Sequence, residues 1–139
     1  MRRRVLASAA LFALVAASAC GGTAEGAFRA RGDKLGQWSM QPDTCLSGLR
    51  HGLFGADLFR HVEGEDTELV VAEELVLARI PGTGKMQVFT REDCSVLEVD
   101  THFNGVRVNG IPGISGSVRL ACERFGVGRI EGSATFTCY

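Results

Sequence analysis

The side chains that could perform acid–base or metal chemistry are few in this chain. His61 and Glu63 stand two positions apart, so in an extended strand both point to one side, and Asp57 is close in sequence. An imidazole beside carboxylates can transfer protons or bind a metal ion. A small secreted hydrolase or metal-dependent enzyme that uses Asp57, His61 and Glu63 is one hypothesis, and a solvated charge cluster is the other. Gly-x-Ser-x-Gly, P-loop and His-Glu-x-x-His patterns are absent from the sequence, so we predict no catalytic residue, no metal site and no cofactor.

Thiols are the second kind of reactive group. The chain has five cysteines: Cys20, Cys45, Cys94, Cys122 and Cys138. The last four lack the close Cys-x-x-Cys spacing of a metal site. When Cys20 is set apart, an even number remains, which is typical of two disulfides in an oxidising compartment.

The N-terminus has the pattern of a secretory signal. Three arginines at positions 2–4 precede fifteen uncharged residues, 5–19. A membrane-spanning helix needs about 20 apolar residues, so this run is short for a permanent span. It fits a signal peptide of residues 1–19 that is cleaved before Cys20, with an uncleaved anchor as the alternative.

The residues around the cleavage point resemble a bacterial lipobox. Ala17-Ser18-Ala19-Cys20 has the small residues and the cysteine of that pattern, although such lipoproteins most often carry Leu at the place of Ala17. The resemblance implies a lipid on Cys20, an anchor in the cell envelope and, with Gly21 next to it, sorting to the outer membrane. Ala17-Ser18-Ala19 also suits ordinary signal peptidase, which would leave an unlipidated periplasmic or secreted, inhibitor-like protein.

Composition excludes one class of partner. After the signal is removed, twelve basic residues face sixteen acidic ones, a formal net charge of −4. A nucleic-acid-binding domain would carry a basic face, so we expect no nucleic-acid partner. The 120 residues from Cys20 onward suffice for one core.

Glycine and periodicity divide the mature chain. Residues 21–36 are glycine-rich and lack hydrophobic periodicity, so we predict a flexible stalk over 20–36, after the lipidated cysteine, and a β-domain over 37–139. A first strand is expected at 35–40 and a hairpin or bulged bend in 49–62. Segments 75–80 and 86–90 flank Pro81-Gly82-Thr83-Gly84 and predict another hairpin. A short helix competes with a strand over 68–78.

The C-terminal third has the clearest pattern. Apolar and polar residues alternate over 97–104, 117–123 and 130–138, which predicts an antiparallel three-stranded meander with one buried face. Because a slip of one residue would expose every apolar side chain, the register follows. We expect Cys122 opposite Ile130, and therefore Ile114 opposite Cys138. A tight turn at 109–110 would place Val99 opposite Leu120, Leu97 opposite Cys122 and Asp100 opposite Arg119, with Glu123 opposite Arg129 in the next pair. The predicted fold is all-β, a small sandwich or barrel-like domain.

This register also predicts the disulfides. Cys138 would lie beside position 114, eight residues or about 26 Å from Cys122 along the strand. A disulfide needs Cα atoms within about 7 Å, so Cys122–Cys138 is excluded. Cys94 precedes the strand that pairs with Cys122. We therefore predict Cys94–Cys122 and Cys45–Cys138.

The whole layout resembles small lipoproteins of Gram-negative soil bacteria that carry a cysteine-bridged β-domain. The resemblance rests on the signal, Cys20 and four segments, 92–94, 106–111, 116–122 and 132–138. It implies an envelope location and no activity. Our first hypothesis is accordingly a non-catalytic binding module, tied to the membrane by its lipid, that contacts an envelope protein or glycan. Trp38, Phe54, Leu58 and Phe59 are expected either in the core or on its binding face.

Overall fold

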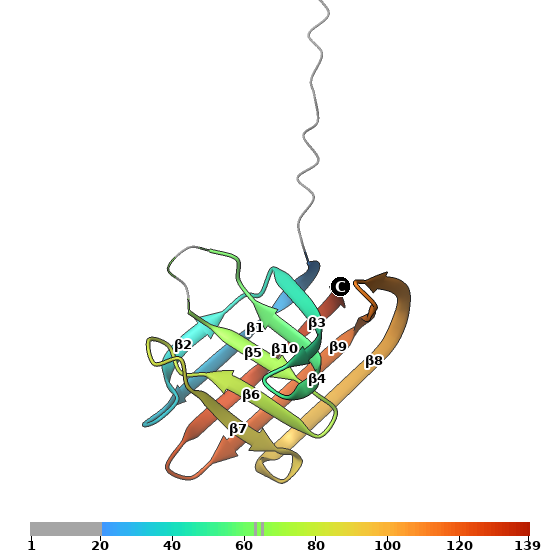
Figure 1. Ribbon diagram of the computed structural model, residues 1–139. Helices are drawn as coiled ribbons and strands as arrows, with labels where there is room; N and C mark the ends of the chain where they lie inside the picture. The colour runs from blue at the N-terminus through green and yellow to red at the C-terminus, as the bar shows by residue number, and fades with distance from the viewer. Residues whose placement is uncertain (1–20, 63, 65) are drawn as a thin grey trace, which may run out of the picture.

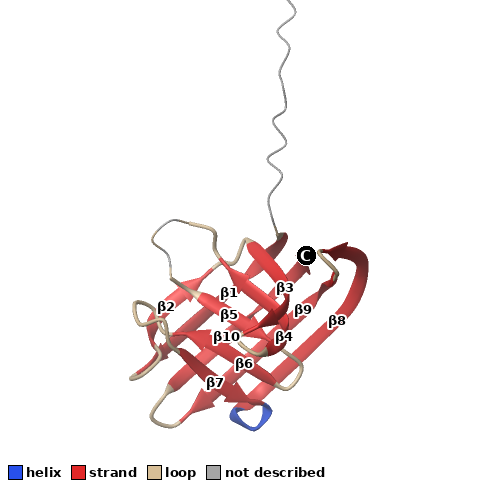
Figure 2. Ribbon diagram, in the orientation of Figure 1, coloured by secondary structure: helices blue, strands red, loops and turns tan. Residues whose placement is uncertain are grey.

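The computed structural model describes residues 21–62, 64 and 66–139, and these residues form an all-β domain, as predicted. Figure 2 shows strands joined by turns, with a single helical turn between β7 and β8. In chain order the elements are β1 (Gly22–Gly32), β2 (Gly36–Met40), β3 (Thr44–Arg50), β4 (Leu53–Phe59), β5 (Glu68–Val71), β6 (Leu75–Arg79), β7 (Met86–Thr90), the 3-10 turn η1 (Arg91–Asp93), β8 (Cys94–Val108), β9 (Ile111–Arg124) and β10 (Gly128–Cys138).

All strands belong to one antiparallel sheet that curls into a half-barrel. Its order is β7-β6-β5-β4-β3-β1-β10-β9-β8, and β2 pairs with β1 outside this path. The strands β5, β6 and β7 cross the direction of β1, β10 and β9 (Figure 1). Residues from both halves therefore share one core, in which Phe28, Leu58, Phe89, Leu120 and Ile130 are among the largest buried side chains.

The predicted stalk is wrong, because most of it is a strand in the middle of the sheet. β1 pairs with β10 from Thr23 to Arg31, and its ends also pair with β3 and β2. Phe28 and Ala30 are buried, whereas Arg29 between them is exposed. The domain thus begins at Gly22. Residues 1–20, with the predicted signal and Cys20, lie outside the described residues.

Glycine concealed this strand in the sequence. A Cβ on Gly22 would lie 1.6 Å from the carbonyl oxygen of Thr137, and one on Gly26 would lie 2.1 Å from that of Ser133. Only a residue without a side chain lets β1 and β10 approach this closely. The glycines that suggested flexibility therefore permit a tight strand pair.

The predicted pairings between β9 and β10 are confirmed. Cys122 lies opposite Ile130, Ile114 opposite Cys138, and Glu123 opposite Arg129. The segment 68–78, where a helix competed with a strand, contains β5 and most of β6, which form a hairpin. The expected strand at 35–40 is β2, and β3–β4 and β6–β7 are hairpins.

The register of β8 is a correction. The turn at 109–110 is tight, but residues 104–106 of β8 face a single residue of β9, so the strand shifts by two positions. Leu97 consequently pairs with Leu120, Val99 with Val118, and Glu98 rather than Asp100 with Arg119. An irregularity of this kind adds residues to one strand only, and alternation alone does not reveal it.

The two disulfides join the predicted pairs. The Cα atoms of Cys45 and Cys138 are 4.8 Å apart, and those of Cys94 and Cys122 are 3.9 Å apart. Cys122 lies directly opposite Cys94 because β8 has a second irregularity at Ser95. Cys45–Cys138 links β3 to β10.

Candidate functional site

The residues proposed for acid–base chemistry do not form one site among the described residues. Asp57 is 1% exposed on β4, and it lines a hollow of about 260 Å³ with Glu68 and Arg79. His61 follows β4, is exposed, and does not line this hollow. Its backbone N–H donates to Oδ1 of Asp43 at 2.9 Å, and this hydrogen bond is the main reason that the pKa of Asp43 lies below its ordinary value. Glu63 lies outside the described residues.

A cluster of charged side chains beside Asp57 has a buried carboxylate, that of Glu68, at its centre. Glu68 is 7% exposed at the start of β5. Its Oε2 accepts two hydrogen bonds from the guanidinium of Arg79, one from Nε at 2.8 Å and one from Nη2. Nε2 of His51, at the tip of the β3–β4 hairpin, lies 2.9 Å from Oε1 of Glu68. The cluster therefore connects that hairpin tip to β5 and β6.

The protonation of Glu68 indicates a structural role for the cluster. Burial raises its pKa, but hydrogen bonds from Arg79 and His51 outweigh burial and leave the pKa below the ordinary value. The same contact with Glu68 raises the pKa of Arg79. A carboxylate held ionised by two partners is a poor proton donor near neutral pH. The sequence analysis did not predict this cluster. Glu68 and Arg79 are equally far from the β5–β6 turn, which places them opposite each other in a hairpin, and this spacing was the signal for it.

Replacing Glu68 tests this role. We expect Glu68→Gln to lower the free energy of unfolding by about 2 kcal/mol at pH 7, because the partly buried guanidinium of Arg79 loses its charged partner. The folded-state pKa of Glu68 is lowered, so its contribution is full above the ordinary value of 4.5 and is lost as the pH falls through the folded value. Urea unfolding at pH 7 and at pH 3 measures the difference, which should shrink at the lower pH.

Glu98→Gln is the matched control for this experiment. Glu98 also accepts two hydrogen bonds from an arginine, Arg119, at 3.1 and 2.7 Å, but both side chains are more than half exposed. Exposed pairs add little to stability, so this variant should unfold almost as the parent does. Equal losses in the two variants, or a loss at Glu68 that persists at pH 3, would contradict the buried-cluster interpretation.

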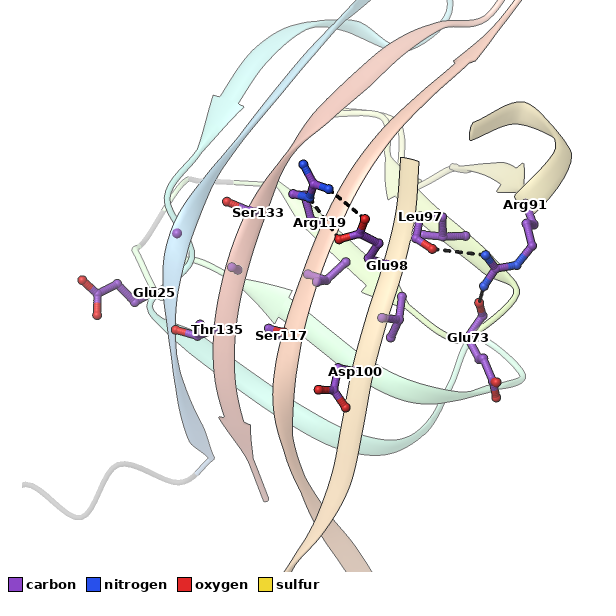
Figure 3. A pocket seen from close by; sticks show the side chains of 14 residues that line it. Glu25, Glu73, Arg91, Leu97, Glu98, Asp100, Ser117, Arg119, Ser133 and Thr135 are labelled. Carbon is purple, nitrogen blue, oxygen red and sulfur yellow. Dashed lines mark hydrogen bonds and ion pairs between the residues drawn. The ribbon is translucent and has the colours of Figure 1, made fainter. Parts of the chain in front are cut away.

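A hollow of about 700 Å³ lies on the polar outer face of β1, β10, β9 and β8. Figure 3 shows its side chains in cross-strand rows, with Glu25, Thr135, Ser117 and Asp100 in one row. The side chains stand beside one another and do not converge on a common point, and Arg119 and Glu98 neutralise each other. This face is open and solvated, and it offers no enclosed position for a ligand.

A smaller hollow, about 220 Å³, lies where the half-barrel remains open. We call it the seam hollow; it lies between the edge strand β8 and the facing ends of β4 and β5. Its lining is mainly apolar and consists of Phe54, Gly55, Val71, Ala72, Glu73, Val99, Thr101, His102, Phe103 and Ile114. Phe103 belongs to the inward-facing positions of β8, opposite the buried Ile114, yet it is 70% exposed. Phe54 on the other side is 49% exposed.

Apolar exposure continues around the seam hollow. Leu49 pairs with Phe54 and is 73% exposed, and Val108 pairs with Ile111 at the exposed tip of the β8–β9 hairpin. Of the four hydrophobic residues considered for a binding face, Leu58 is fully buried, Trp38 and Phe59 are partly buried, and Phe54 is at the seam. Alternation predicted that Phe103 faces inward; it did not predict that the barrel stays open there.

The chain matches no protein-family model, no curated protein and no solved structure with which it was compared. Among the described residues, no helix is long and apolar enough to cross a membrane. The same residues contain no group of three or more His, Cys, Asp or Glu side chains placed to hold a metal ion. The fold and the seam hollow therefore define the class of protein on their own: a small, disulfide-bridged β half-barrel with an open apolar seam.

Proposed function

We propose that this protein is an exported, lipid-anchored component of the cell envelope that acts as a non-catalytic binding module. The observation that carries the binding role is the seam hollow, where Phe54 and Phe103 present apolar surface to solvent from opposite sides. Hydrophobic surface gathered at one hollow is typical of interaction sites. The volume, about 220 Å³, is below the 300–1,000 Å³ or so of small-molecule pockets. It suits a side chain of a partner protein.

The anchor part of the proposal rests on the N-terminal pattern and on the disulfides. Two cystines suit an oxidising compartment. Because β1 begins at Gly22, a lipid on Cys20 would hold the domain against the membrane surface without a spacer. The start of β1 and Phe103 lie at the same end of the sheet. Gly22 is level with Cys138, Cys138 pairs with Ile114, and Ile114 pairs with Phe103. The seam hollow would then face a partner close to the membrane.

Mass spectrometry of the mature N-terminus tests the anchor. We expect the chain to begin at Cys20 with acyl chains on that residue. An unmodified thiol, or cleavage at another bond, would remove the lipid anchor from the proposal.

Photo-crosslinking in the exporting cell tests the binding role. A benzoylphenylalanine at position 103 should give a discrete adduct with one envelope protein. The same probe at Phe125, which is fully exposed in the turn between β9 and β10, is the matched control and should give none. Equal adducts at both positions, or none at position 103, would contradict a site at the seam. Adducts with glycan alone would contradict a protein partner.

A further inference from the structure

We infer that the seam hollow receives an extended segment of the partner, which adds a strand to the free edge of β8 with apolar side chains at alternate positions. This inference rests on the proposed binding role. It goes further because it names the conformation and the chemistry of the partner segment.

The first argument is the direction of the backbone groups of β8. The carbonyl oxygen of Leu97 accepts a hydrogen bond from Nη1 of Arg91 at 3.1 Å, so it points away from β9. The carbonyl oxygen of Asp100 points toward β9, since a Cβ on Gly116 would lie 1.8 Å from it. In an antiparallel strand these directions alternate. The N–H and C=O groups of Val99, Thr101 and Phe103 therefore face the open edge.

The second argument is that the sheet protects its edges elsewhere. β7 and β8 are the two edge strands of the sheet order. On β7, Nη1 of Arg124 donates to the carbonyl oxygen of Val88 at 2.6 Å. On β8, Arg91 covers Leu97, and the irregularity at 104–106 interrupts the strand above Phe103. Charged residues and bulges are the usual means of preventing strand addition. Between Leu97 and this irregularity, β8 has no bulge and no arginine on a backbone carbonyl oxygen among the described residues, and the charges of Glu98 and Asp100 lie on its outer face.

The third argument is that the unprotected stretch borders the seam hollow. Val99, Thr101 and Phe103 all line it. In antiparallel pairing, a residue that exchanges hydrogen bonds with one of them has its side chain on the same face of the sheet. Those partner side chains would enter the apolar hollow, which favours Val, Leu or Phe.

The charge on the outer face of β8 determines which residues suit the positions between the apolar ones in the partner segment. They would project beside the outer face of β8, where Asp100 forms no ion pair with any other described residue. A cationic residue there gains a favourable contact with Asp100. The expected partner segment is thus about five residues long and alternates apolar with basic side chains.

Synthetic peptides test the inference on the mature protein as it is recovered from the envelope and held in lipid nanodiscs. The probe is a fluorescein-labelled Lys-Val-Lys-Phe-Lys-Val peptide, with binding measured by fluorescence anisotropy. Methylating the backbone nitrogens of Val and Phe removes the donors that face β8, and we expect binding to weaken about tenfold or more. Methylating the backbone nitrogens of the lysines instead should leave affinity unchanged, because those N–H groups face away from β8. If both methylated peptides bind equally weakly, or if the peptide methylated at the lysines binds more weakly, antiparallel strand addition is wrong.

Two variants of the edge strands give the complementary test. Thr101→Pro removes an edge N–H that makes no bond to β9, and proline is tolerated on edge strands, so the fold should persist while binding weakens about tenfold. Val88→Pro, the same kind of change on the other edge strand β7, lies outside the seam hollow and should bind as the parent does. Circular dichroism and thermal unfolding confirm that both variants are folded.

The outcomes separate this inference from the proposed function. If position 103 forms its discrete adduct but Thr101→Pro binds the peptide as the parent does, the binding module stands and strand addition is wrong. If no peptide binds and position 103 forms no adduct, both fail. A dimer formed through β8 in size-exclusion chromatography, abolished by Thr101→Pro, would show that the occupant is a second copy and would overturn the partner segment.

Discussion

Replacing Cys45 and Cys138 together by serine is expected to lower the free energy of unfolding by about 4–5 kcal/mol. The disulfide spans a sequence separation of 93 residues, and closing a loop of that size removes much of the freedom of the unfolded chain. It also lies where the two halves of the sheet meet. There β1 and β3 share only the pairs Gly22 with Cys45 and Thr23 with Thr44. Urea unfolding under non-reducing conditions measures the loss.

The second disulfide supplies the comparison. Cys94 and Cys122 are separated by 28 residues, so replacing both by serine should cost less, about 3.6 kcal/mol. Non-reducing peptide mapping should recover the two predicted pairs. A larger loss from the shorter loop, or a fragment that joins Cys122 to Cys138, would contradict the arrangement.

The second large effect is expected at Phe28, within the segment that the sequence suggested to be a stalk. Phe28 is 2% exposed in the common core, so Phe28→Ala should lower the free energy of unfolding by about 3–5 kcal/mol through lost burial and a residual cavity. In a flexible stalk the same change would have no effect. Thermal and urea unfolding of the mature protein distinguish the two.

Arg29→Ala is the control for this variant. Arg29 is exposed on the same strand, and its backbone pairs with Glu131 and Ser39 whatever its side chain is. We expect little change in the unfolding midpoint. If both variants lose stability equally, β1 is sensitive to any substitution. If neither loses stability, the prediction of a flexible stalk is correct after all.

The seam and the charge cluster divide the surface of the domain by role. His51, Glu68 and Arg79 connect the β3–β4 hairpin to β5 and β6. The seam hollow, by contrast, borders backbone groups of β8 with no neighbouring strand among the described residues. Stability and binding can therefore be perturbed separately, by Glu68→Gln and by Thr101→Pro.

The sequence by itself determined what depends on local alternation and spacing. Polarity alternates along β9 and β10 with a period of two, so these strands had a single register that buries Val118, Ile130 and Phe136, and the pairing of the cysteines followed. It misjudged β1, where glycines replace apolar residues at inward positions, and β8, where residues 104–106 shift the register.

Only the tertiary structure decided which inward-facing residues are covered. Phe28 and Phe103 occupy equivalent inward positions of their strands, yet one is buried and the other is largely exposed. The difference arises because the curled sheet stops before β8 meets β4 and β5. Where a sheet stops curling depends on contacts between residues far apart in the chain, and the period of a single strand carries no information about them. The seam hollow exists because the sheet stops there.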